Sequence, residues 1–168
     1  MRMPDEYIAD KIMDLFNYCL SKKVKPDIEV NDVKEFDIEK IRRMKAELGI
    51  KGVILDVDET IRKNMQMIPK CNKEWIEQVK KELKIIVVSN GVDRKVEEYL
   101  RGQGIDYIGF ATKPLRGNFR KACNRMGLEP EEVLVIGDKL FDDIFGGKRS
   151  NMKTMLVKGV SDTPEDER

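Results

Sequence analysis

From Gly49 onward, short apolar runs alternate with longer charged stretches, and this alternation limits the folds open to the chain. Apolar runs such as GVILDV at 52–57 suit strands that are buried on both faces. The predicted strands are 52–57, 85–89, 105–110, 133–137 and 154–157, and the predicted helices between them are 73–83, 93–101, 115–126 and 141–149. This order predicts a three-layer α/β/α domain with a doubly wound, Rossmann-like parallel sheet.

Two helices are predicted before this domain. The first spans residues 5–23 and carries an apolar stripe at helical spacing. The second spans about 37–48, with Asp37 suited to its N-cap and Gly49 to its C-terminal end. We therefore expect a helical extension at 1–50 packed on the core, a core domain at 51–160 and a flexible tail at 161–168. Contact of the first helix with a membrane is the alternative to packing.

Composition excludes several kinds of chemistry. The chain has no histidine, which removes Ser-His-Asp and Cys-His catalysis and histidine-bound zinc. The three cysteines form no CxxC pair, which argues against zinc and dithiol sites. The net charge of +1 predicts no nucleic-acid partner. No apolar run is long enough to span a bilayer and no signal peptide is visible, so we expect a cytoplasmic protein, with peripheral membrane contact as the alternative.

The end of the first strand of this domain carries two acids. Asp56 and Asp58 lie two residues apart, so their side chains leave the strand on the same side. Two like charges this close need a cation or a shared proton. Taken alone, the pair is equally well explained as acidic turn residues.

The other strand ends also carry polar residues. The second strand ends at Ser89 and Asn90, the third is followed by Lys113, and the fourth ends at Asp138. The next predicted helix opens with acids at 142–143, which capping alone would explain. In an open α/β sheet the ligand site lies beyond these strand ends, so we expect the side chains to meet.

Together these residue types favour phosphoryl chemistry. Oxygen ligands without nitrogen or sulfur suit Mg²⁺. A hydroxyl, main-chain amides and an ammonium group around that metal suit a phosphoryl group. One carboxylate can attack phosphorus, and a second can protonate the leaving oxygen and then activate water.

The motifs resemble those of the haloacid dehalogenase (HAD) superfamily. DxDxT stands at 56–60, the second-motif hydroxyl is Ser89, the third-motif lysine is Lys113, and GDxxxD or GDxxxxD begins at Gly137. The segments YIGFATKPL at 107–115, GDKLFDDIFGGKR at 137–149 and PDEYI at 4–8 resemble the YqeG family of subfamily IIIA. That family is similar to the phosphatidylglycerophosphate phosphatases of mitochondria and plastids.

The resemblance implies a HAD-like fold and hydrolysis of phosphate monoesters through an aspartyl-phosphate. It makes Asp56 the nucleophile and a metal ligand, and Asp58 the general acid and base whose main-chain carbonyl also binds Mg²⁺. It makes Asp138 a metal ligand. A metal-bound water is then held by Asp143, with Asp142 as the alternative. The residues expected to contact phosphate are Thr60, Ser89, Asn90 and Lys113.

Only about 28 residues separate Thr60 from Ser89, so no cap domain fits between them. An open site suits a substrate that brings its own cover, such as a lipid head group, a protein or a nucleic acid, and oligomerisation would also cover it. The resemblance puts phosphatidylglycerophosphate first, with a nucleotide or sugar phosphate as the alternative. A phosphorylatable receiver domain and a non-catalytic HAD-fold binding protein are further alternatives.

Overall fold

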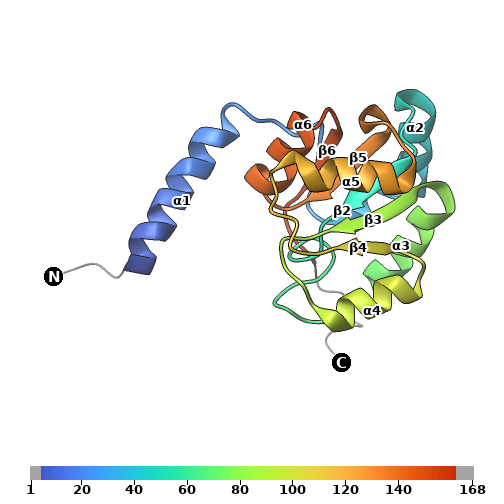
Figure 1. The fold of residues 1–168 in the computed structure, drawn as a ribbon, viewed down its shortest axis with the longest axis horizontal. Helices are drawn as coiled ribbons and strands as arrows, with labels where there is room; N and C mark the ends of the chain where they lie inside the picture. The colour runs from blue at the N-terminus through green and yellow to red at the C-terminus, as the bar shows by residue number, and fades with distance from the viewer. Residues whose placement is uncertain (1–4, 162–168) are drawn as a thin grey trace.

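A parallel six-stranded sheet with helices on both faces forms the centre of the computed structural model, which describes residues 5–161 and side chains from residue 8 onward (Figure 1). The strands are β1 (Ile28–Val30), β2 (Gly52–Leu55), β3 (Lys84–Val88), β4 (Asp106–Ile108), β5 (Val133–Gly137) and β6 (Lys153–Val157). Their order is β1-β6-β5-β2-β3-β4, and every neighbouring pair is parallel. The predicted α/β class is confirmed, and β2 lies inside the sheet, where the strand order reverses.

The helices bury the two faces of the sheet separately. The helices α2 (Ile38–Leu48), α3 (Lys70–Glu82) and α4 (Arg94–Gly102) cover one face, and α5 (Arg116–Met126) and the short α6 (Gly146–Arg149) cover the other. Side chains alternate along β2, so that Val53 packs towards the first set of helices and Ile54 towards α5. Both faces are apolar, as the unbroken apolar runs of the sequence predict.

Residues 28–50 belong to the core, so the division expected at residue 50 is not a structural boundary. β1 pairs with β6, and Val30, Phe36, Ile41 and Ile50 are all buried. The predicted caps of α2 are present: the Asp37 side chain accepts a hydrogen bond from the main-chain N–H of Lys40, and Gly49 is left-handed. Strand β1 was not predicted, because three residues at a sheet edge are too few to show a period.

The first helix, α1 (Asp5–Ser21), extends away from the sheet (Figure 1). Its stripe is largely exposed, with Ile12 and Leu15 each 63 % accessible. It contacts the turn η3 (Leu140–Phe145), where the rings of Phe16 and Phe141 meet edge to face at 5.1 Å. Phe16 belongs to the predicted stripe, so one stripe residue reaches the domain while Ile12 and Leu15 stay exposed, and packing of the whole extension on the core stays a prediction. None of the helices described is long and apolar enough to cross a bilayer.

The chain leaves β6 alongside β1. The main-chain N–H of Lys158 donates to the carbonyl of Val30, and that of Gly159 to the carbonyl of Asn31. Ser161 donates from its main-chain N–H and its hydroxyl to one carboxylate oxygen of Asp32, each at 2.7 Å. Of the tail expected to be flexible, only Ser161 lies within the described residues, and it is held in place.

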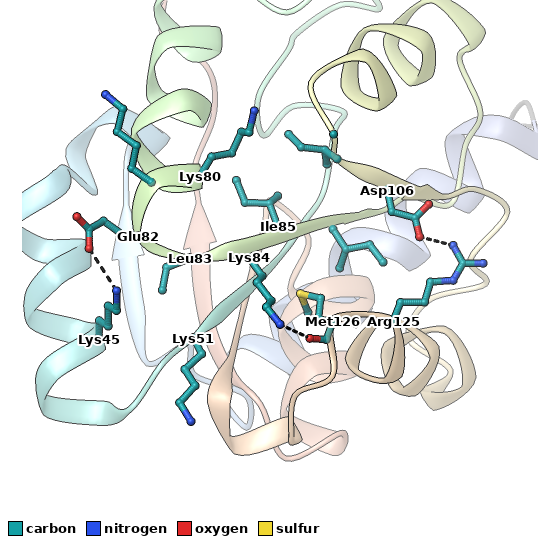
Figure 2. A pocket seen from close by; sticks show the side chains of 14 residues that line it. Lys45, Lys51, Lys80, Glu82, Leu83, Lys84, Ile85, Asp106, Arg125 and Met126 are labelled. Atoms are coloured by element: carbon teal, nitrogen blue, oxygen red, sulfur yellow. Dashed lines mark hydrogen bonds and ion pairs between the residues drawn. The ribbon is translucent and has the colours of Figure 1, made fainter.

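A cavity of about 670 Å³ lies at the amino ends of β2, β3 and β4 (Figure 2). Its basic side chains are Lys45, Lys51, Lys80, Lys81, Lys84 and Arg125. Several of them already have partners: Lys45 reaches Glu82, Arg125 reaches Asp106, and Lys84 donates to a main-chain carbonyl. This end of the sheet is thus broad and exposed, and much of its charge is neutralised locally.

Candidate active site

The carboxyl ends of the strands bring the predicted polar residues together. Asp56 follows β2, Ser89 follows β3, Lys113 lies in the loop after β4, and Asp138 follows β5. They surround a cavity of about 50 Å³, which we call the phosphoryl pocket. It is lined by Asp56, Asp58, Ser89, Asn90, Gly91, Lys113, Lys139, Asp142 and Asp143. Asp138 adjoins it through the carboxylate cluster described next.

Three carboxylates form a tight cluster. Oxygens of Asp56, Asp138 and Asp143 all lie within 4.8 Å of one another. One oxygen of Asp138 is buried and has no hydrogen-bond partner. Burial, together with the charges of Asp56 and Asp143, raises the pKa of Asp138 to about 7. Burial and the charge of Asp56 also raise the pKa of Asp143. Two carboxyl groups with raised pKa values, one of them with an unpartnered oxygen, fit a bound cation.

Lys113 places a positive charge inside this cluster. Its side chain is 3 % exposed, and its ammonium group donates to Asp56 at 2.8 Å and to Asp143 at 2.7 Å. Burial opposes the charge on Lys113, but the two carboxylates more than offset it and raise its pKa above the ordinary value. The lysine is therefore a permanent cation at neutral pH.

The loop that carries Lys113 has an unusual backbone. Phe110 and Thr112 adopt left-handed conformations with φ of 48° and 50°. Side chains with a Cβ rarely adopt this region, and such residues concentrate at functional sites. The main-chain N–H of Lys113 donates to the side-chain oxygen of Asn90 at 2.8 Å, which ties this loop to the loop after β3.

Asp56 is held by contacts on both carboxylate oxygens. Lys113 donates to one oxygen, and the Thr60 hydroxyl donates to the other at 3.1 Å. Its main-chain N–H continues the sheet by bonding to the carbonyl of Ile136. Thr60 was expected among the phosphate contacts, but it is fully buried and does not line the phosphoryl pocket. Its position suits it to orient Asp56 instead.

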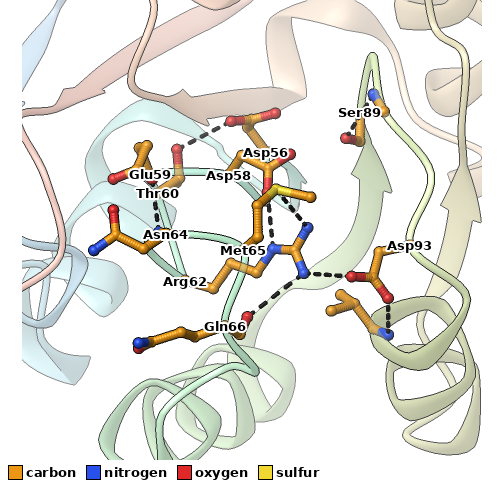
Figure 3. A network of polar contacts seen from close by, with 12 residues as sticks. Asp56, Asp58, Glu59, Thr60, Arg62, Asn64, Met65, Gln66, Ser89 and Asp93 are labelled. Carbon is orange, nitrogen blue, oxygen red and sulfur yellow. Dashed lines mark hydrogen bonds and ion pairs between the residues drawn. The ribbon is translucent and has the colours of Figure 1, made fainter.

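Asp58 is paired with a buried arginine that sequence reasoning missed (Figure 3). Arg62 is 2 % exposed and donates from Nε to Asp58 at 2.8 Å and from Nη1 to Asp93 at 2.7 Å. Asp93 also caps α4 by accepting from the N–H groups of Lys95 and Val96. Arg62 thus connects the loop after β2 to the start of α4. The one available signal was the i,i+4 spacing of Asp58 and Arg62.

The two acids left open by the sequence occupy different positions. Asp143 is 1 % exposed and lies in the cluster, whereas Asp142 is half-buried and accepts a hydrogen bond from Asn90 at 3.3 Å. The predicted helix at 141–149 begins with the π-helical turn η3, which then continues into α6. A side chain at Gly137 would come within 2.2 Å of Asp143, so glycine is required there for the carboxylate to approach.

Lys139 is a further residue that the sequence analysis did not assign. It lines the phosphoryl pocket directly after Asp138, and its main-chain N–H donates to Asp143 at 3.2 Å. Its place next to the GD motif was a usable signal. Of the residues expected at the site, the structure brings all to this edge of the sheet, with Thr60 behind Asp56 and the Asp58 side chain outside the carboxylate cluster.

Comparison with known sequences identifies relatives that match most of the chain, including the residues of this site. Residues 12–101 match the family model of mitochondrial PGP phosphatase, and residues 110–168 match a HAD-hydrolase-like model. The probable phosphatase YqeG of Bacillus subtilis is 34 % identical, over 84 % of this chain and 81 % of its own. Phosphatidylglycerophosphate phosphatase 1 of Arabidopsis thaliana is 27 % identical, over 84 % of this chain and 43 % of its own.

Comparison with solved structures supports the fold. An uncharacterized protein from Listeria monocytogenes superposes with a TM-score of 0.55 at 20 % identity, over 68 % of this chain and 84 % of its own. A hypothetical protein from Xanthomonas campestris superposes with a TM-score of 0.53 at 13 % identity, over 76 % of this chain and 70 % of its own. At these identities the likeness concerns the fold alone.

Proposed function

Because the chain belongs to the YqeG and PGP-phosphatase family of HAD-superfamily phosphatases, we propose that it hydrolyses phosphate monoesters with Mg²⁺ through a phosphorylated Asp56. The observation that carries this proposal is the cluster of three carboxylates around a buried lysine. A purely structural ion pair would need only one acid for one lysine. Here three acids surround the lysine, and a buried oxygen of Asp138 has no partner.

The donor set fits Mg²⁺. Asp56, Asp138 and Asp143 are the side chains that would hold it, and all their donors are oxygen. When bound, Mg²⁺ offsets the charge of these acids and of the phosphoryl oxygens. A bound Mg²⁺ would supply a partner for the buried oxygen of Asp138 that has none in the protein.

The chain's own residues account for both half-reactions. A carboxylate oxygen of Asp56 attacks phosphorus, and the bond from phosphorus to the ester oxygen breaks. Asp58 donates a proton to the departing oxygen and later takes a proton from the water that attacks the acyl phosphate. That second attack releases inorganic phosphate and restores Asp56. In both steps Lys113 offsets the negative charge of the phosphoryl oxygens, and the Ser89 hydroxyl orients them.

We propose phosphatidylglycerophosphate as the first substrate to examine. The support is the match to the mitochondrial PGP phosphatase model and the similarity to the Arabidopsis phosphatase. The small phosphoryl pocket is consistent with an ester whose remainder lies outside it. Some relatives are described as glyceraldehyde 3-phosphate phosphatases, such as that of Methanothermobacter thermautotrophicus, which is 32 % identical over 62 % of this chain and 49 % of its own. Sugar phosphates therefore belong in the same panel of substrates.

The test is a turnover assay of the full chain with p-nitrophenyl phosphate, phosphatidylglycerophosphate, nucleotides and sugar phosphates, with Mg²⁺ and with EDTA. We expect Mg²⁺-dependent release of phosphate, and a phosphorylated peptide containing Asp56 after an acid quench during turnover. Full activity in excess EDTA would refute the metal assignment, and a phosphorylated peptide lacking Asp56 would refute the nucleophile.

A further inference from the structure

A second cavity opens beside the phosphoryl pocket. It measures about 530 Å³ and lies between α1, η3 and β6. We call this cavity the α1 groove. Its apolar wall consists of Met13, Leu140, Phe141, Leu156 and Val157. The ring of Phe141 also stacks on that of Phe145 at 5.7 Å and meets the ring of Phe16 edge to face.

The two cavities adjoin each other. Lys139 and Asp142 line both of them, and Asp138, a member of the carboxylate cluster, also lines the α1 groove. The phosphoryl pocket, at about 50 Å³, has room for little beyond a phosphoryl group, whereas the α1 groove falls in the size range of ligand sites. The part of a bound ester that does not react could therefore lie in the neighbouring α1 groove.

The wall of the α1 groove selects the kind of group that can lie there. Away from the shared end, Asn17 and Lys158 are its polar side chains, so sugar hydroxyls would find few partners along most of its length. An apolar chain would instead cover side chains that are now wet, including Met13, which is 56 % exposed.

We propose that the α1 groove binds the alkyl or acyl chain of a phosphorylated amphiphile whose phosphoryl group lies against Asp56. This rests on the proposed phosphatase function and adds a place and a chemical class for the part of the substrate that does not react. It also gives α1 a role, since Met13 supplies the wall of the groove that the sheet domain lacks.

The experiment measures kcat/KM for straight-chain alkyl phosphates from butyl to decyl, all below their micelle concentrations, with p-nitrophenyl phosphate as reference. We expect kcat/KM to rise about two- to fourfold per methylene until the groove is filled, and at least about tenfold from butyl to octyl. Met13→Ser should lower the octyl-to-butyl ratio at least about threefold, and Met13→Leu should keep it. The ratio is internal to each variant, so a loss of folded protein does not affect it.

Leu48→Ser is the matched control, because Leu48 is also an exposed apolar helix residue but lies outside the α1 groove. It should leave the ratio unchanged. A flat chain-length series with good turnover of every ester would overturn the groove and leave the phosphatase function standing. The groove is equally overturned if the ratio is steep but is not changed by Met13→Ser. Absence of turnover with any ester would instead remove the proposed function itself.

Discussion

The two ends of the sheet treat charge in opposite ways. At the amino ends, a cavity of about 670 Å³ is lined by exposed lysines and an arginine whose acidic partners lie at the surface. At the carboxyl ends, a pocket of about 50 Å³ is lined by acids and two lysines, and Asp56, Asp143 and Lys113 among them are buried. The larger cavity says less about function, because surface ion pairs are common and contribute little to stability.

The difference shows where the fold holds an unfavourable arrangement. The buried end keeps three carboxylates together with one lysine and leaves an oxygen of Asp138 without a partner. Folding alone does not favour such a group, since each buried and unsatisfied polar atom destabilises the native state. An arrangement of this kind is expected where a ligand supplies the missing interaction.

The largest expected difference between the two ends is catalytic. Asp56→Asn should reduce turnover of p-nitrophenyl phosphate at least about a hundredfold, because an amide does not form the acyl phosphate. The matched acid at the other end is Asp106, which pairs with Arg125 at the start of β4. Asp106→Asn should retain wild-type turnover. Equal activity of the two variants would sink the assignment of Asp56.

A second pair of variants compares the lysines. Lys113→Met should lower turnover by about a hundredfold and destabilise the metal-free fold by about 3 kcal/mol, because it leaves buried carboxylates without their cation. Lys84→Met removes an exposed lysine at the amino ends and should change neither quantity. Urea unfolding in EDTA and steady-state rates measure both effects. Similar unfolding midpoints for the two variants would contradict the argument.

The third prediction separates the acid–base role from attack on phosphorus. Asp58→Asn should slow hydrolysis of an alkyl phosphate about tenfold more than that of p-nitrophenyl phosphate, because an activated leaving group needs less help from a proton donor. Rates on the two esters in wild type and variant give this ratio directly. Equal losses on both would take Asp58 out of the acid role.

The smallest expected effect concerns pH and stability without metal. The pKa of Asp138 is about 7 in the fold against an ordinary 3.8, so the native state binds this proton more tightly than the unfolded chain. Stability in EDTA should therefore fall as pH rises from about 4 to about 7, and Asp143 acts in the same direction. Asp138→Asn removes one of these ionisations.

At pH 8 in EDTA, Asp138→Asn should melt a few degrees above wild type, and the difference should vanish near pH 4. Added Mg²⁺ should raise the wild-type midpoint more than that of the variant. Scanning fluorimetry across this pH range measures the curves. Parallel curves for the two proteins would show that Asp138 ionises without penalty.

Much of the site followed from the sequence because parallel strands end at one edge of the sheet. Asp56, Ser89 and Asp138 each follow an apolar run directly, so placing the strands also places these side chains. The choice between Asp142 and Asp143 did not follow, because a π-helical turn changes which residue faces inward. Nor did the role of Thr60, since its burial depends on how the loop after β2 folds back.

The parts that the sequence did not predict depend on distant partners. Arg62 reads as a surface residue, and its burial depends partly on Asp93, which lies 31 residues further along the chain. Strand β1 has three residues and owes its place to pairing with β6. The stripe on α1 has the period of a packed helix, but period alone does not say what covers it.

The pairing of β1 with β6 has a consequence for the order of folding. Ile28 lies opposite Met155, and Asp27 accepts a hydrogen bond from the main-chain N–H of Thr154, so the contacts of β1 span most of the chain. During synthesis, β1 leaves the ribosome first among the strands and has no partner until β6 has emerged. Strands β2, β3 and β4, at the other side of the sheet, pair over much shorter separations and close smaller loops. We therefore expect these three strands to pair before the β1 edge forms, so that the connection from α1 to the domain is the last part to become ordered.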